Sequence, residues 1–109
     1  MPEYNPHDAA DFIYNQAPIY AKACGDLAAV EAYKSSLKAI LMKKSGETSL
    51  GAQEREAYAH EEYQNLCDAI GTATEQVQLL RWQIKAAEMR FEAWRTEQAN
   101  NRNFDRMIK

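Results

Sequence analysis

The sequence predicts an all-α protein, an antiparallel helical hairpin of the coiled-coil type with a short helix at its N-terminus. Three observations predict this class. Apolar residues recur at alternating steps of three and four through most of the chain, which is the spacing of one helix face. All three prolines fall within residues 1–18, so none interrupts a helix after that point. Serine and glycine mark one internal segment, residues 45–51, as the expected turn.

The composition fits one small domain, residues 1–109, of which 46% are hydrophobic and 27% are charged. The net charge is −3 and the pI is about 5.4, which argues against a dedicated duplex-DNA binder but allows a local basic patch. No apolar run approaches the roughly 18 residues of a membrane span, and the first residues lack the pattern of a signal peptide. We therefore expect no membrane association, and a protein that stays in the cytosol where it is made.

Two helices are expected to meet at Pro18. Residues 1–17 form a leader with a short helix, because Pro6 suits a first helical position and Phe12 supplies apolar surface to bury. Pro18 ends that helix or begins the next, since proline lacks the backbone N–H and disfavours the α conformation in the residue before it. A second helix then spans residues 18–44.

Helix 18–44 has an amphipathic stripe that Lys34 interrupts once. The apolar members of the stripe are Tyr20, Ala23, Leu27, Val30, Leu37 and Leu41. Gly46 suits the left-handed conformation that often closes a helix, so residues 45–51 are expected to form a loop. Ser49 can cap the helix that follows, because its hydroxyl can accept a free backbone N–H of the first turn.

The second half of the chain predicts one long helix over residues 52–100 and a tail at 101–109. Its apolar residues step by three and four through more than four heptads, which is the pattern of a coiled-coil seam. The seam comprises Tyr63, Leu66, Ile70, Ala73, Val77, Leu80, Ile84, Ala87, Phe91 and Trp94. The pattern changes register near His60, which allows a bend there. A short loop between two long helices implies an antiparallel hairpin.

A second apolar stripe lies on the same helix, about 150° round from the seam. Its members are Leu79, Trp82, Ala86, Met89 and Ala93. One neighbouring helix cannot cover both faces, and a large exposed apolar patch is rare on a monomer. We therefore expect these five residues to form the interface of a homo-oligomer, so that the hairpins assemble into a helical bundle. The other reading is a compact monomer in which the leader helix covers this stripe.

No pattern in the sequence meets the needs of an active site. His60 and the two glutamates after it invite a metal reading, but a zinc protease needs a second histidine four residues on, and the other histidine is His7. Cys24 and Cys67 lack zinc spacing and lie in apolar helical patterns, so we expect two reduced core thiols. Neither a Gly-rich phosphate loop nor a nucleophile elbow is present. The prediction is a protein that is not an enzyme and takes no cofactor or metal.

Two basic groups are candidates for nucleic-acid binding. They are Lys38, Lys43 and Lys44 near the end of helix 18–44, and Arg95, Arg102 and Arg106 near the C-terminus. The arginines alternate with aromatic and amide side chains, a combination that suits single-stranded nucleic acid, where bases stack and phosphates are neutralised. The plainer reading is that the lysines complement the dipole of their helix and the arginines belong to a solvated end.

Three runs resemble a family of small helical proteins of tailed bacteriophages. They are SLKAILM (36–42), AQEREAYAHEEYQ (52–64) and LRWQIKAAEMRFEAWRTEQANNR (80–102). The last run is the most specific, because its Trp and Arg placements exceed what heptad spacing requires. The resemblance implies a phage protein in the cytoplasm of its bacterial host, from an early gene region near recombination and annealing functions. It provides no catalytic or binding residue, and gene neighbourhood is a weak argument for function.

Two functions are consistent with these observations. The first is a non-catalytic, oligomeric accessory protein of a phage that assists DNA recombination or replication through protein contacts and weak single-stranded DNA binding. The second is a phage protein that binds a host protein, such as a defence or metabolic factor, and inhibits or redirects it. Binding to a labelled oligonucleotide at low salt distinguishes the two.

Overall fold

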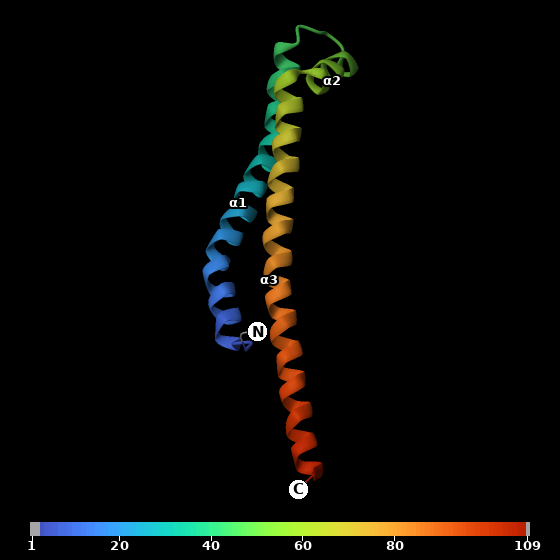
Figure 1. The fold of residues 1–109 in the computed structure, drawn as a ribbon. Coiled ribbons are helices and arrows are strands. Elements are labelled where there is room, and N and C mark those ends of the chain that lie inside the picture. The colour runs from blue at the N-terminus through green and yellow to red at the C-terminus, as the bar shows by residue number, and fades with distance from the viewer. Residues whose placement is uncertain (1–2, 109) are drawn as a thin grey trace. The chain divides into compact units, whose positions relative to one another are not determined.

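The computed structural model describes residues 3–108, which form three α-helices and no strand. α1 spans Pro6–Lys44, α2 spans Leu50–Ala59 and α3 spans Glu61–Ile108 (Figure 1). The all-α prediction is confirmed. The chain divides into two units. The first unit comprises the residues up to 20 and from 79 onward, and the second unit comprises residues 21–78. Both α1 and α3 therefore contribute to each unit.

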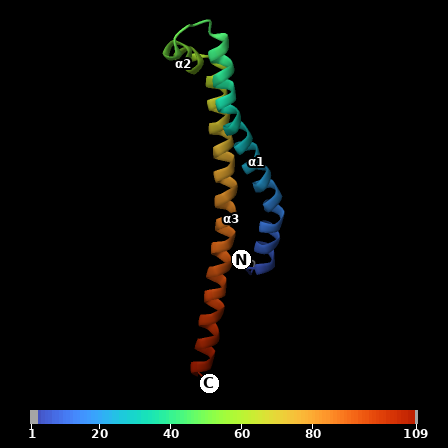
Figure 2. The ribbon, with the colours of Figure 1, turned by 180° about the vertical axis from the view of Figure 1, so that it is seen from behind.

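The core of the second unit lies where the end of α1 meets α2 and the start of α3. Its buried members are Leu37, Leu41, Ala57 and Tyr63, with Met42, Leu66 and Cys67 packed against them. The edge of one aromatic ring meets the face of another at Tyr58 and Tyr63, whose centroids lie 5.3 Å apart. Figures 1 and 2 view this unit from opposite sides, and both show α2 beside the junction of the two long helices. Since the end of α1 packs on the start of α3, these helices run antiparallel here, as a hairpin requires.

The turn between α1 and α2 is shorter than the predicted loop of residues 45–51. The hydroxyl of Ser45 donates to a carbonyl in the last turn of α1 at 2.8 Å. Gly46 has a φ of 76°, the left-handed conformation that glycine adopts without steric cost. Ser49 caps α2 as predicted, because its hydroxyl oxygen accepts a first-turn backbone N–H at 3.2 Å. α2 therefore begins at Leu50, inside the predicted loop.

The single helix predicted over residues 52–100 is two helices that meet at His60. His60 has extended backbone angles, φ −67° and ψ 138°. Its ring Nδ1 accepts the backbone N–H of Glu62 at 3.1 Å, and its carbonyl oxygen accepts the N–H of Gln64 at 3.1 Å. His60 thus satisfies N–H groups at the start of α3, which would otherwise lack partners. The bend that the sequence allows at this point is a break between two helices.

The prediction that the long helix ends at residue 100 was wrong, because α3 continues to Ile108. The predicted tail at 101–109 contains neither proline nor glycine, so nothing in it stops a helix that is already formed. Arg106 lies in the last turn, where a cation is favourable for the helix dipole.

The predicted break at Pro18 was also wrong, because α1 is continuous from Pro6 to Lys44. Proline inside a helix removes one hydrogen bond to the carbonyl four residues earlier and costs about 3 kcal/mol. Here that carbonyl belongs to Tyr14, whose side chain is 80% exposed, and Pro18 is exposed as well. Water can reach this side of the helix, and the residues on both sides of Pro18 favour the same helix strongly enough to offset the local cost.

The predicted seam of α3 faces the rest of the protein. Its ten residues, from Tyr63 to Trp94, are all buried or half-buried. In the first unit, the seam residues Phe91 and Trp94 lie 6.0 Å apart, and the ring of Tyr4 lies 6.1 Å from that of Trp94. Tyr4, which precedes α1, and the first residues of α1 therefore cover the late part of the seam, and Figure 1 shows α1 and α3 running in opposite directions in this unit.

Candidate functional site

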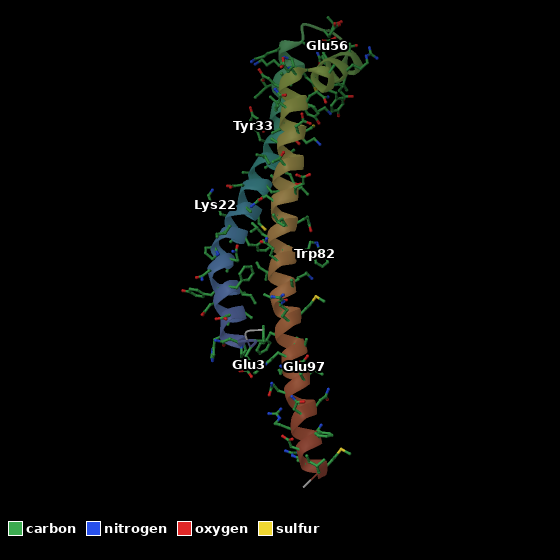
Figure 3. The ribbon with its side chains drawn as sticks, in the orientation of Figure 1. Glu3, Lys22, Tyr33, Glu56, Trp82 and Glu97 are labelled. Carbon is green, nitrogen blue, oxygen red and sulfur yellow. The ribbon has the colours of Figure 1, made fainter. Side chains whose placement is uncertain are left out.

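The strongest candidate site is the exposed stripe of α3, formed by Leu79, Trp82, Ala86, Met89 and Ala93. All five residues are exposed. The large side chains are far from covered, with 54% of Leu79, 61% of Trp82 and 69% of Met89 in contact with solvent. In Figure 3, Trp82 projects from the side of α3 that faces away from α1. The expectation that the leader helix could cover this stripe in a monomer is therefore not fulfilled in the first unit.

Helix geometry explains why the chain leaves this stripe uncovered. Each residue advances the helix by about 100°, so the exposed stripe and the seam lie on nearly opposite faces of α3. In the first unit, α1 packs against the seam side, where Leu80 is 6% exposed and Phe91 and Trp94 are half-buried. A single neighbouring helix covers one face and leaves the other in solvent.

The apolar face of α3 extends further than the sequence interpretation placed it. Phe104, Met107 and Ile108 are 62%, 83% and 67% exposed. Their positions at about 100° per residue place them on the same side of the helix as the exposed stripe. The spacing of these three residues is visible in the sequence, but it indicates a helix face only if residues 101–108 are helical. Because the sequence predicts a tail there, this part of the apolar face was not predicted.

Charged residues lie along one flank of the exposed stripe. Lys85 lies over the ring of Trp82, with its Nζ 5.6 Å from the ring centroid. Glu92 pairs with Arg95 three residues later at 3.8 Å, but both side chains are more than 60% exposed, so the pair contributes little to stability. These flanking charges are free to change partner when another surface approaches.

Of the six basic residues predicted to bind nucleic acid, Lys38 is engaged inside the second unit. Its Nζ lies 4.7 Å from the centroid of the Tyr58 ring and 3.7 Å from a carboxylate oxygen of Glu54. A hydrogen bond with Tyr58 is the main cause that raises the pKa of Lys38 above 10.5, and the negative charge of Glu54 adds to it. This lysine therefore joins α1 to α2, and its charge already has an acidic partner.

The remaining basic residues are exposed but belong to different units. Lys43 and Lys44 end α1 in the second unit, where they complement the helix dipole. Arg95, Arg102 and Arg106 are exposed on one side of α3 in the first unit. Residues 79–108 carry six basic side chains against four acidic ones, although the whole chain is acidic. The end of α3 is thus a local basic surface in an acidic protein.

Comparison with protein-family models, with curated proteins and with solved structures gives no match to this chain. The resemblance to a phage family stays a prediction, and the candidate site depends on geometry alone.

A shallow groove of about 360 Å³ lies between α1 and α3 in the first unit. It is lined by Pro6, Ala9, Ala10, Ile13, Glu88, Phe91 and Glu92. Sites for small molecules usually combine an apolar pocket with several converging polar groups. The polar side chains here are two glutamates on the same helix, and the other five lining residues are apolar, so no side-chain donor is present to orient a substrate. The groove is better explained as the imperfect packing of two helices.

The described part of the chain forms neither a metal-binding cluster nor a membrane-spanning helix. No group of three His, Cys, Asp or Glu side chains there could hold a metal ion. None of the described helices is both long and apolar enough to cross a membrane. The motif at His60 that invites a metal reading has instead the capping role described above. The exposed stripe and the basic end of α3 remain as surfaces for macromolecules.

Proposed function

We propose that this chain is a non-catalytic helical protein that self-associates through the exposed stripe of α3. The observation that supports this function is the exposure of Leu79, Trp82 and Met89 along one face of a helix whose opposite face is already packed. Burying apolar surface stabilises an assembly by roughly 25 cal/mol per Å², so large side chains that stay in water favour association. Contiguous apolar surface of this kind marks interaction sites in soluble proteins.

A substitution in the stripe tests this function. Trp82→Asp places a charge at the centre of the proposed interface, where burying it without a partner costs several kcal/mol. We expect sedimentation velocity to show an oligomer for the wild type and a monomer for the variant, with helicity retained by circular dichroism. Tyr14→Asp is the matched control, because Tyr14 is also an exposed aromatic residue in the first unit but lies on α1. A wild type that is already monomeric contradicts the proposal.

The basic end of α3 favours a second activity, weak binding of single-stranded DNA. Arg102 and Arg106 are exposed, and the aromatic residue Phe104 between them is 62% exposed. Arginine neutralises phosphate, and an exposed aromatic ring can stack on a base. Together with the resemblance to early-region phage proteins, this suggests an accessory protein of recombination or replication in the cytoplasm of a bacterial host.

Charge reversal tests the nucleic-acid activity. Changing Lys43, Lys44, Arg102 and Arg106 to Glu should abolish binding of a labelled single-stranded oligonucleotide and leave the helical signal intact. Two double variants, R102E/R106E and K43E/K44E, change the net charge equally. A difference in oligonucleotide affinity between them therefore reports the position of the contact and not the net charge. Wild-type affinity should fall steeply with salt. If the wild type binds no oligonucleotide at low salt, the proposed DNA-binding activity is wrong. The alternative is then a phage protein that binds a host protein and inhibits or redirects it.

A further inference from the structure

We infer that the exposed stripe of α3 takes α3 of a second copy in antiparallel orientation, with Lys85 of each copy facing Glu92 of the other. This inference rests on the proposed self-association and names its partner, direction and register. The observations behind it are the spacing of the stripe, the sizes of its side chains and the charges on its flanks.

The spacing limits which residues can face each other. The stripe steps by three, four, three and four residues from Leu79 to Ala93. In an antiparallel pair, each three-residue spacing on one helix must lie opposite a three-residue spacing on the other, so that the stripe residues form layers. This condition is met when Trp82 faces the partner's Ala93 and Ala86 faces the partner's Met89. It is also met in registers shifted from this one by whole heptads.

Side-chain sizes fit this antiparallel register. Two of the three large residues of the stripe meet an alanine, since Trp82 packs on the partner's Ala93 and Met89 packs on the partner's Ala86, while Leu79 faces the partner's Thr96. Alternating large and small residues across an interface fills space to the density of a protein interior. A parallel pair would place each residue against its own copy, Trp82 against the partner's Trp82 and Ala86 against the partner's Ala86. That arrangement crowds one layer and leaves a void in the next.

The flanking charges select the same direction and register. In the antiparallel pair Lys85 lies opposite the partner's Glu92, and the two-fold symmetry repeats this contact. Shifting the register by one heptad brings Lys85 opposite the partner's Lys85, or Glu92 opposite the partner's Glu92. In a parallel pair, a flanking residue of one helix lies opposite the residue five positions later in the other. Lys85 would then face the partner's Arg90, and Glu92 would face the partner's Glu97. All of these alternatives place like charges together, which is destabilising.

Both side chains are accessible for this contact. Lys85 is half-buried, and its Nζ lies 5.6 Å from the ring centroid of Trp82, which is itself part of the stripe. The side chain of Glu92 is 62% exposed, and its pair with Arg95 at 3.8 Å is weak enough to be replaced. Glu92 also lines the shallow groove between α1 and α3, but most of its side chain stays in solvent, and the five residues of the stripe are all exposed.

Exchanging the charges of Lys85 and Glu92 tests the inference, because it predicts whether each substitution weakens or restores the dimer. Lys85→Glu turns two attractive contacts into repulsive ones, so the dissociation constant of the dimer should rise by on the order of tenfold in sedimentation equilibrium at low salt. Glu92→Lys should weaken the dimer similarly, and the double variant K85E/E92K should return the constant to near the wild-type value. Arg81→Glu is the control, because it changes the net charge equally but lies off the flanks of the stripe.

The possible outcomes separate this inference from the function on which it rests. In a parallel dimer, Lys85→Glu would face the partner's Arg90 and tighten association, and that result overturns the antiparallel pairing. A double variant as weak as the single ones would also overturn it, because the two side chains would then not be in contact. A monomeric wild type would instead contradict the proposed self-association itself.

Discussion

At the residue scale, the stability of the second unit depends on a few buried side chains. Leu41 is 4% exposed and Leu37 is 5% exposed, and both pack on Ala57 of α2 and Tyr63 of α3. No other large cluster of buried residues supports the turn of the hairpin in the described part of the chain. Each of these leucines should therefore contribute a large share of the free energy of unfolding.

Leu41→Ala should lower the free energy of unfolding by about 2–4 kcal/mol, because it removes buried methyl groups and leaves a cavity. Ile40→Ala is the matched control, since Ile40 is the next residue on the same helix but is 41% exposed. Its cost should stay under about 1 kcal/mol. Urea unfolding at one fixed protein concentration measures both, because association would otherwise alter the apparent stability. Equal losses for the two variants would mean that the core lies elsewhere.

The raised pKa of Lys38 predicts that its contribution to the stability of the folded state is lost at alkaline pH. A lysine whose pKa is higher in the folded state stabilises that state fully below its unfolded value of about 10.5, and loses this contribution as the pH rises through the folded value. The wild type should therefore melt at a higher temperature than Lys38→Gln at pH 8, and the gap should narrow above pH 10.5. A gap that does not change with pH would mean that only the stem of Lys38, packed on Tyr58, stabilises the unit.

At the element scale, the sequence predicted helix faces better than helix ends. Apolar spacing identified the buried side of α3 from Tyr63 to Trp94, because burial on one helix face imposes that periodicity directly. Pro18, by contrast, was read as a boundary from its local preference alone. The apolar stripes on either side of it are in phase, and tertiary packing outweighs one lost hydrogen bond. The extension to Ile108 was missed because residues 100–103 are polar and interrupt the apolar pattern before Phe104, Met107 and Ile108 continue it.

Replacing Pro18 provides a test of the continuous helix. Pro18→Ala restores a backbone N–H and improves helix propensity, so it should raise the free energy of unfolding by about 1–3 kcal/mol in chemical denaturation. Gly25→Ala, at another exposed position within α1 that has open space around it, should give a smaller gain of up to about 1 kcal/mol. If Pro18→Ala leaves stability unchanged or lowers it, Pro18 lies at a boundary between two helices rather than inside one.

The candidate site was predicted in part. The spacing of Leu79, Trp82 and Met89 identified the stripe, and their exposure agrees with an interface that this chain does not cover by itself. The engagement of Lys38 with Tyr58 and Glu54 could not be predicted, because it depends on how α2 folds back beside α1. Sequence spacing relates residues within one helix, whereas contacts between helices depend on a turn geometry that Ser45, Gly46 and His60 determine.

At the scale of the whole molecule, one property connects the fold to the proposed function. In the first unit, α3 has apolar surface on two nearly opposite faces, and α1 packs on only one of them. Among the residues that the structure describes, the groove between α1 and α3 in the first unit is open and has few polar groups, so it does not resemble an enclosed small-molecule site. A second copy of the chain would cover the remaining face without any change in the fold of either unit.

The mass of the wild-type protein in solution tests this account most directly. Sedimentation equilibrium across a range of micromolar concentrations should give a multiple of the chain mass of 12.4 kDa, with dimers as the first associated species. The fluorescence of Trp82 should shift to shorter wavelength over the same range, as its ring leaves water. A mass of 12.4 kDa at every concentration would show that the exposed stripe of α3 has no partner in a second copy.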